Sequence, residues 1–308
     1  MESRPLDKWI LVTGANDGGL GEATSVAFLA RGFNVIAASF DDEPLSFTKP
    51  LKGSTDGFLV RLGLDTTSAR SIEAAVEHVQ QLTEGKLDIL INLAGCGYYM
   101  PLIDAHIKDA RNQFDVNVWG TLAITQALFP MLRAAKGIII NHITIAGVSG
   151  LTDPFTGIYA SSQAALRSLS DTMRLELAPF EIKVITLITG PAKAKPARRT
   201  TEDMRFGLSE ASPYRYIEDD AVESMLSLIS AESDHQWFQV AEDMVRDLYK
   251  EPTPAYIING YITLLLWWIG WLLPAWLTDW VTLQRSGLLR LKGPARSDPG
   301  RIENKKMI

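Results

Sequence analysis

The chain has 308 residues, of which 46% are hydrophobic and 21% charged, values ordinary for a globular protein that can bury a substantial core. Its formal net charge of −6 argues against nucleic acid as a partner, because nucleic-acid-binding proteins carry basic faces. The single cysteine, Cys96, excludes an internal disulfide framework and suits a reducing compartment.

The N-terminal residues lack the apolar stretch that is typical of a secretory signal peptide. The first apolar run, residues 9–12, leads directly into a glycine-rich turn. We therefore expect the fold to begin almost at the N-terminus and the protein to be cytoplasmic.

Short apolar runs alternate with helical patterns along the first 190 residues. Such runs are typical of strands that are buried on both faces of a sheet. We expect strands at residues 9–12, 33–38, 58–60, 87–91, 137–140 and 182–188. Helical patterns lie near residues 21–31, 68–83, 108–134 and 159–178. This alternation predicts an α/β fold, a Rossmann-type doubly wound parallel sheet with helices on both faces.

A polar segment follows the last of these strands. Residues 190–215 contain prolines and two adjacent arginines. They come directly after the C-terminal end of a strand, where ligands bind in open α/β sheets, so we expect a substrate loop here. A helix near 217–230 and an acidic stretch that reaches Glu251 should follow.

Residues 252–278 contain no charged side chain and are rich in leucine and tryptophan. Their length is sufficient to cross a bilayer, which needs about 20 apolar residues. The flanking charges oppose a span, because residues 285–308 carry seven Lys/Arg against two acids and residues 241–254 carry two against four. A single span would send the basic tail across the membrane, against the positive-inside tendency.

Two other interpretations of this stretch stay open beside the span. It forms an apolar helix pair that packs on the domain or caps the substrate cleft, or it contacts a membrane peripherally through residues 255–280, with tryptophans at headgroup depth. We divide the chain into a Rossmann domain at residues 1–250 and, at residues 251–308, an apolar helical appendage with a basic tail.

A glycine-rich turn, Thr13-Gly14-Ala15-Asn16-Asp17-Gly18-Gly19-Leu20-Gly21, joins the first predicted strand to the first predicted helix. Glycines here let the backbone pass close to a pyrophosphate, which would lie on the free N–H groups of the helix N-terminus. Glycines are also common in loops for turn geometry alone. The prediction of a dinucleotide site therefore depends on the position of this turn between a strand and a helix.

Further motifs follow in order and at a consistent spacing: Asn92-Leu93-Ala94-Gly95 after the fourth strand, Asn117 within a predicted helix, Tyr159-Ala160-Ser161-Ser162-Gln163 at the start of another, and Gly190 after the next strand. Over about residues 8–250 this array resembles the short-chain dehydrogenase/reductase family. The four residues between Gly14 and Gly19, and the run at 271–280, are similar to a fungal subgroup that resembles acyl-dihydroxyacetone-phosphate reductases.

The resemblance implies a nicotinamide dinucleotide site. The glycines would hold the pyrophosphate, Asp65 would contact the adenine and Asn92 would lie beside the adenosine ribose. The residues implied in cofactor binding are Gly14, Gly19, Leu20, Gly21, Ser39, Asp65, Asn92, Ala94, Tyr159, Gln163, Gly190 and Ala192.

The resemblance also implies the catalytic residues. Tyr159 would be the proton donor, and Asn117 would support the active-site helix and a water relay. The serine that orients the substrate in the family falls on Thr144, whose hydroxyl can still donate to a carbonyl oxygen, and Ser149 stays as the alternative. We interpret His142, two residues before Thr144 on the same strand, as structural.

Gln163 departs from the family pattern, which has a lysine four residues after the tyrosine. Glutamine can hydrogen-bond the nicotinamide ribose but contributes no positive charge to lower the pKa of Tyr159, which is near 10 in an unperturbed tyrosine. Tyr159 should therefore stay protonated at neutral pH. It would then be a proton donor in carbonyl reduction and a poor base for alcohol oxidation.

NADP(H) is the expected cofactor, with NAD as the alternative. NAD enzymes usually carry an acid at the end of the second strand, where this chain has Ser39. Basic residues for a 2′-phosphate are also missing, since Phe40, Asp41 and Asp42 follow. The absence of the acid and the resemblance to the subgroup favour NADP(H).

The expected function is an NADP(H)-dependent reductase of a hydrophobic carbonyl substrate, lipid-like or a secondary metabolite. The alternatives are a non-redox isomerase or cyclase on the same fold, and a cofactor-binding member with weakened or lost catalysis. The resemblance implies a homodimer through the helices near 108–134 and 159–178. It also implies peripheral attachment to the endoplasmic reticulum or lipid droplets, and no metal is expected.

Overall fold

Seven strands form one parallel sheet in the order β3-β2-β1-β4-β5-β6-β7, so the predicted doubly wound α/β fold is confirmed. The computed structural model describes residues 7–40, 57–148, 153–190, 207–219, 222, 235–248 and 250–292. The strands are β1 (Trp9–Thr13), β2 (Asn34–Ser39), β3 (Leu59–Gly63), β4 (Ile89–Asn92), β5 (Ile138–Thr144), β6 (Lys183–Thr189) and β7 (Tyr256–Asn259).

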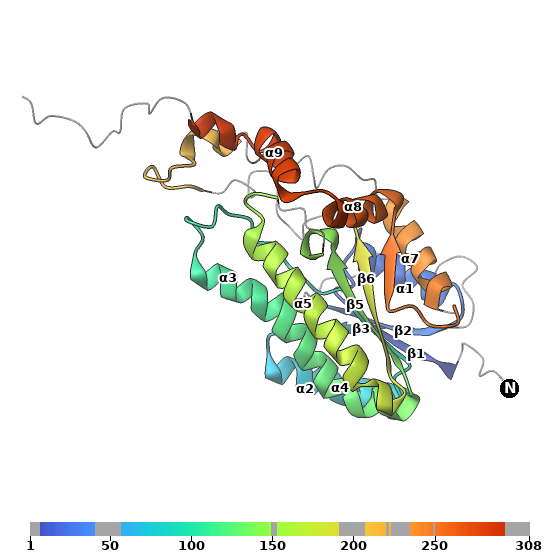
Figure 1. Ribbon diagram of the computed structural model, residues 1–308. Helices are drawn as coiled ribbons and strands as arrows, with labels where there is room; N and C mark the ends of the chain where they lie inside the picture. Colours follow the sequence, from blue (N-terminus) through green and yellow to red (C-terminus); the bar gives the residue numbers. More distant parts are fainter. Residues whose placement is uncertain are drawn as a thin grey trace, which may run out of the picture.

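Helices cover both faces of the sheet (Figure 1). α1 and α7 lie on one face, and α2, α4 and α5 lie on the other. The bounds are α1 (Leu20–Leu29), α2 (Ala69–Thr83), α3 (Ile107–Phe114), α4 (Thr121–Ala135), α5 (Gly157–Glu176), α7 (His235–Leu248), α8 (Tyr261–Leu272) and α9 (Ala275–Arg285).

The apolar core is divided by the sheet into two layers. Alternate side chains of a strand point to opposite faces. In β1, Ile10 therefore packs with Phe28 and Met244 of α1 and α7, whereas Leu11 packs with Leu128 and other residues of the opposite layer. Because both faces of these strands are buried, the strands read as continuous apolar runs in the sequence.

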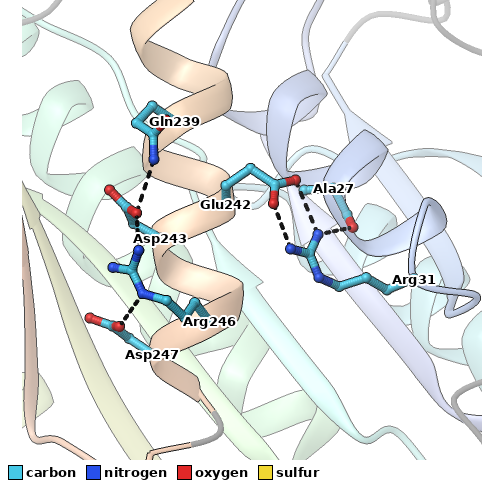
Figure 2. Close-up of polar contacts among 7 residues, drawn as sticks. All are labelled: Ala27, Arg31, Gln239, Glu242, Asp243, Arg246 and Asp247. Atoms are coloured by element: carbon cyan, nitrogen blue, oxygen red, sulfur yellow. Dashed lines mark hydrogen bonds and ion pairs between the residues drawn. The ribbon is translucent and has the colours of Figure 1, made fainter.

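An ion pair fastens the two helices of the first layer to each other. Figure 2 shows Arg31, just after α1, reaching Glu242 of α7, with its Nη1 also donating to the carbonyl of Ala27 at 2.9 Å. Both partners are partly exposed, so the pair adds at most about 1 kcal/mol of stability. On the other side of α7, the amide of Asn259 donates to Asp243 at 3.1 Å and ties this helix to β7.

Two elements were absent from the sequence prediction. α7 and β7 follow the segment at 190–234, and β7 pairs in parallel with β6, with Thr189 opposite Asn259. The last strand of the sheet therefore lies inside the range assigned to the appendage, and we propose to place the domain boundary after Asn259. The predicted helix at 108–134 is present as α3, a single π-helical turn at Asp115–Gly120, and α4.

The appendage consists of α8, α9 and a short 3₁₀ segment at Leu288–Lys292, located at the carboxyl end of the strands (Figure 1). Within the described residues, no helix has the length and apolar character needed to cross a membrane. Three predictions lie wholly or largely outside the described residues: the substrate loop apart from Gly190 and residues 207–215, the helix at 217–230, and the alternative residue Ser149.

Candidate active site

The polar residues singled out in the sequence gather at the carboxyl edge of the sheet. Thr13 ends β1, Asn92 ends β4, Thr144 ends β5 and Thr189 ends β6. β1 and β4 are neighbours, although β2 and β3 follow β1 in the chain. The strand order reverses at this point, and ligands of doubly wound sheets bind there.

The turn after β1 is built so that only glycine fits at two positions. Gly14 has φ +68°, and a Cβ on it would lie 2.8 Å from the backbone of Ala94. A Cβ on Gly21 would lie 2.3 Å from the Gly14 carbonyl oxygen. The turn therefore packs directly against the segment that follows β4.

The N-terminus of α1 suits an anionic group. Its N-cap residue is Gly19, which has no side chain to cap the first turn of the helix. Uncapped N–H groups at a helix N-terminus are a favourable site for phosphate. Glu22 of the first turn accepts the N–H of Gly18 at 2.5 Å and holds the turn in shape. These residues fit the pyrophosphate of a dinucleotide.

Ala94 has a structural role that the sequence did not indicate. The Thr13 hydroxyl accepts the N–H groups of Leu93 and Ala94 at 3.1 and 3.2 Å. These bonds hold the segment after β4 against the glycine turn. The N–H of Ala94 is therefore used inside the protein.

Three further residues predicted to bind cofactor lie along the same edge. Ser39 is buried at the end of β2. Asp65 follows β3, and its Oδ1 accepts the N–H and the hydroxyl of Thr67 at 2.8 and 2.6 Å. Asn92 is buried, and its Nδ2 donates to Asn141 at 2.8 Å. Its buried Oδ1 has no hydrogen-bond partner among the residues that the structure describes.

Tyr159 and Thr144 face each other across the start of α5. Burial raises the pKa of the Tyr159 phenol, and the adjacent hydroxyl of Thr144 opposes this rise. The Thr144 Oγ1 is buried, and its polar neighbour is the Tyr159 hydroxyl. A hydroxyl can both donate and accept, so this pair is suited to bond a bound substrate oxygen.

Gln163 lies on the same face of α5 as Tyr159, one helical turn later. It is buried, and its Oε1 accepts the backbone N–H of Thr144 at 2.9 Å. The carboxamide thus connects α5 to the end of β5. The sequence predicted the proximity of Gln163 to Tyr159 but not this bond.

Asn117 organises the start of the catalytic helix from the π-helical turn. Its Oδ1 accepts the N–H of Cys96 at 2.8 Å, and its Nδ2 donates to the Cys96 carbonyl and to Ser162 at 3.0 and 3.1 Å. Ser162 in turn donates to the Tyr159 carbonyl at 2.8 Å and accepts from Gln113 at 3.1 Å. Asn117 therefore connects the turn after β4 with the backbone that carries the phenol.

Tyr99 is a site residue that the sequence analysis missed. Its ring centre is 5.4 Å from that of Tyr159. A Cβ on Gly97 would lie 2.8 Å from the Tyr99 ring, so glycine is needed for this ring to fold back over the site. The adjacent tyrosines Tyr98 and Tyr99, directly after the motif at 92–95, were the available signal. Tyr99 belongs to an apolar cluster in front of Tyr159 that includes Tyr98, Met100, Phe155, Leu208, Tyr214, Ile217 and Leu288.

His142 and Gly190 complete the described part of this edge. His142 Nε2 lies 2.9 Å from the Thr189 hydroxyl, and burial lowers the pKa of the imidazole to about 4. A Cβ on Gly190 would lie 2.8 Å from the Thr263 hydroxyl of α8, so the appendage packs closely against the end of β6. Ala192, also predicted to contact the cofactor, lies outside the described residues.

Comparisons with known proteins agree with this arrangement. A family model described as "short chain dehydrogenase" matches residues 8–205. "Short-chain dehydrogenase ptmH" from Penicillium ochrochloron is 34% identical over 288 residues, 91% of this chain and 98% of that protein. The "NADPH-dependent 1-acyldihydroxyacetone phosphate reductase" of Schizosaccharomyces pombe is 35% identical over 189 residues, 61% of each chain.

The fold is also found in solved structures. A short-chain dehydrogenase from Streptomyces avermitilis superposes with a TM-score of 0.69 over 92% of this chain and 97% of that chain, at 24% sequence identity. At this level of identity the likeness concerns the fold.

Proposed function

The chain belongs to the short-chain dehydrogenase/reductase family, and from this premise we propose that it is an NADP(H)-dependent reductase of a hydrophobic carbonyl compound. The observation that carries the proposal is the pair formed by the Tyr159 phenol and the buried Thr144 hydroxyl beside it. Two hydroxyls that face each other at the carboxyl edge of the sheet can both reach one carbonyl oxygen.

The two hydroxyls have different roles at that oxygen. A bound nicotinamide would supply the hydride that reduces the carbonyl carbon. Thr144 donates a hydrogen bond to the carbonyl oxygen and orients the substrate. Tyr159 gives its phenolic proton to the same oxygen as the alcohol forms, and solvent restores that proton. Proton transfer by a positioned side chain contributes typically 10²–10⁴-fold to a rate.

The direction of the reaction follows from the pKa of Tyr159. Burial raises this pKa, and Gln163 brings no positive charge to lower it. The phenol therefore stays protonated at neutral pH, which is the state needed for reduction. Oxidation of an alcohol needs the phenolate, which is scarce under these conditions.

The cofactor proposal depends on Ser39. Ser39 takes the position at the end of β2 where NAD enzymes usually carry an acid for the ribose 2′-hydroxyl. The name of the fission yeast relative, an NADPH-dependent reductase, supports the same assignment. NAD stays as the alternative, and comparative titration with NADPH and NADH separates the two.

A hydrophobic substrate suits the surroundings of Tyr159. The cluster around Tyr99 is aromatic and aliphatic, and Leu288 brings the end of the appendage into it. Small-molecule sites are usually apolar cavities with a few polar groups that fix orientation. We therefore propose a lipid-like compound or a secondary metabolite as the substrate.

A non-redox isomerase or cyclase is the second candidate. The observation that favours it is Gln163, because an uncharged side chain does not lower the pKa of Tyr159. In this alternative the cofactor is retained as a scaffold, and the phenol acts as a general acid on a substrate that is neither oxidised nor reduced.

The decisive experiment is titration of the purified protein with NADPH and NADH, followed by a panel of carbonyl compounds. We expect tighter binding of NADPH and turnover of hydrophobic ketones or aldehydes. Tyr159→Phe should still bind NADPH through the glycine turn and lose about 10²-fold or more of the turnover at saturating cofactor. NADPH binding without redox turnover of any carbonyl would favour the second candidate, and absence of binding would refute both.

We also propose that the appendage makes the chain a peripheral membrane protein. Three tryptophans of α8 and α9 are more than half exposed: Trp268 at 55%, Trp276 at 70% and Trp280 at 58%. Tryptophan favours the membrane–water interface. The endoplasmic reticulum and lipid droplets are the proposed locations, and a homodimer through α4 and α5 is the proposed assembly.

A further inference from the structure

The hydrogen bond between Gln163 and Thr144 gives the glutamine a specific task. The bond joins the buried Oε1 of Gln163 to the backbone N–H of Thr144 at 2.9 Å, and so links α5 to the carboxyl end of β5. Thr144 is the last residue of β5, and its buried hydroxyl lies beside that of Tyr159. Whatever fixes the backbone of Thr144 also fixes that hydroxyl.

The packing around Gln163 leaves little freedom to the bond. A Cβ on Gly147 would lie 2.6 Å from the Gln163 Cβ and 2.7 Å from the Ala164 nitrogen. The short 3₁₀ turn at Ile145–Gly147 therefore lies directly on α5 at Gln163. The Thr144 side chain itself makes no capping hydrogen bond to this turn. Gln163 therefore supports the point where β5 ends through its bond to the Thr144 N–H.

We propose that Gln163 is a positioning residue, which holds the Thr144 hydroxyl at the substrate oxygen by accepting the Thr144 N–H. The proposal rests on the reductase function proposed above. It assigns to Gln163 a role toward the substrate through Thr144, in place of a charge effect on Tyr159.

The chemistry of the side chain makes this role specific. A carboxamide offers an acceptor oxygen, whereas an ammonium group has three donors and no acceptor. A lysine at position 163 could not accept the Thr144 N–H. Its ammonium group would instead face this N–H, so that two hydrogen-bond donors would oppose each other. Gln163→Lys is therefore expected to release the end of β5, not to improve turnover.

Two variants of similar side-chain length distinguish the loss of the hydrogen-bond acceptor from a change in side-chain volume. Gln163→Glu keeps an acceptor oxygen, and Gln163→Met removes it. The readout is hydrogen exchange at the Thr144 amide in the full chain, measured by mass spectrometry with single-residue fragmentation. We expect Gln163→Met and Gln163→Lys to speed this exchange by about tenfold, and Gln163→Glu to leave it within about twofold of the wild type.

A double-mutant cycle then tests whether Gln163 acts through the threonine hydroxyl. Gln163→Met should lower kcat/KM by about tenfold at saturating NADPH. In a Thr144→Val background, where the hydroxyl is already gone, the same substitution should cost less than about twofold, because the two residues act as one unit.

Two results would overturn the proposal. One is unchanged exchange at Thr144 in a folded Gln163→Met protein, with Gln163→Lys giving the same result if Gln163→Met does not fold. The other is a full tenfold loss in the Thr144→Val background. Wild-type protein without reductase activity would instead refute the proposed function, and the exchange measurement would then decide the role of Gln163 by itself.

Discussion

At Tyr159, burial and the neighbouring hydroxyl act in opposite directions on the pKa of the phenol, and burial dominates. A raised pKa means that the phenol stays protonated from pH 6 to 9. We predict that carbonyl reduction is nearly independent of pH in this range. Alcohol oxidation should be slow at pH 7 and rise by up to about tenfold per pH unit, because the phenolate fraction rises in that proportion.

The measurement is a pair of pH–rate profiles, with saturating cofactor in each direction. Tyr159→Phe serves as the control, since its residual oxidation rate should lack the rise with pH. Efficient alcohol oxidation at pH 7 by the wild type would contradict the prediction and would show that another group lowers the pKa of the phenol.

His142 is the second titratable group whose environment has a measurable consequence. Burial lowers the pKa of its imidazole to about 4, against about 6.5 in an unfolded chain. The folded state therefore excludes a proton that the unfolded state binds. The stability due to the neutral form is present above pH 6.5 and is lost as the pH falls toward 4, by up to about 3 kcal/mol.

We predict that the free energy of unfolding falls more steeply between pH 7 and 4.5 in the wild type than in His142→Gln. Urea unfolding at both pH values measures the two slopes, and the difference removes the common effect of carboxylate protonation. Equal slopes in the two proteins would mean that His142 can be protonated in the folded state.

The polar residues of the site were predictable to different degrees. Tyr159, Thr144 and Asn117 belong to spaced motifs, so the sequence indicated their meeting. Tyr99 belongs to no such spacing, and its ring lies against Gly97, where a Cβ would come within 2.8 Å of it. The bond from Thr144 to Gln163 depends on side-chain direction, which no sequence pattern reports.

At the scale of elements, the β1–α1 turn is the most constrained connection. We predict that Gly14→Ala is far more destabilising than Gly85→Ala. Both glycines have positive φ, 68° and 78°, so both alanines pay a similar conformational strain of about 1 kcal/mol. Only at Gly14 would the Cβ also meet the backbone of Ala94, at 2.8 Å, whereas nothing lies within 4 Å at Gly85.

Urea unfolding and NADPH titration of the two variants measure this difference. Gly85→Ala, at the opposite end of the sheet, should lose about 1 kcal/mol of stability and keep its NADPH affinity. Gly14→Ala should lose several kcal/mol, because backbone cannot move aside as a flexible side chain can, and its NADPH affinity should fall by at least about tenfold. Similar losses in both variants would show that the contact with Ala94 relaxes easily.

The sequence predicted the strands that are buried on both faces of the sheet. It did not predict an element whose apolar pattern runs into that of its neighbour. Residues 9–12 and 182–188 read as strands because both faces are covered. β7 lies in the uncharged stretch at 252–278, where its four residues run into the apolar pattern of α8. α7 has buried residues at helical spacing, so its pattern was present and overlooked: Trp237, Val240, Ala241, Met244, Val245 and Leu248.

At the scale of the whole molecule, the exposed tryptophans of α8 and α9 are the feature that bears on partners. Leucines 264, 265, 272 and 273 of the same segment are also exposed. Large exposed apolar patches mark interaction sites. The sequence after α9 is rich in lysine and arginine, which favours an anionic lipid surface over a second copy of the same basic segment.

We predict that the protein co-floats with vesicles that contain phosphatidylserine. The double substitution Trp276→Ser and Trp280→Ser should lower the bound fraction by about tenfold or more. The reason is that each indole buried in the membrane interface contributes roughly 1.5–3 kcal/mol. Trp119→Ser is the matched control, since Trp119 is 53% exposed but lies in the π-helical turn, away from the appendage. Sedimentation of the same variants tests self-association, which is the alternative to membrane binding. Self-association that depends on Trp276 and Trp280, without binding to vesicles of any charge, would assign these tryptophans to an interface with a second copy of the chain.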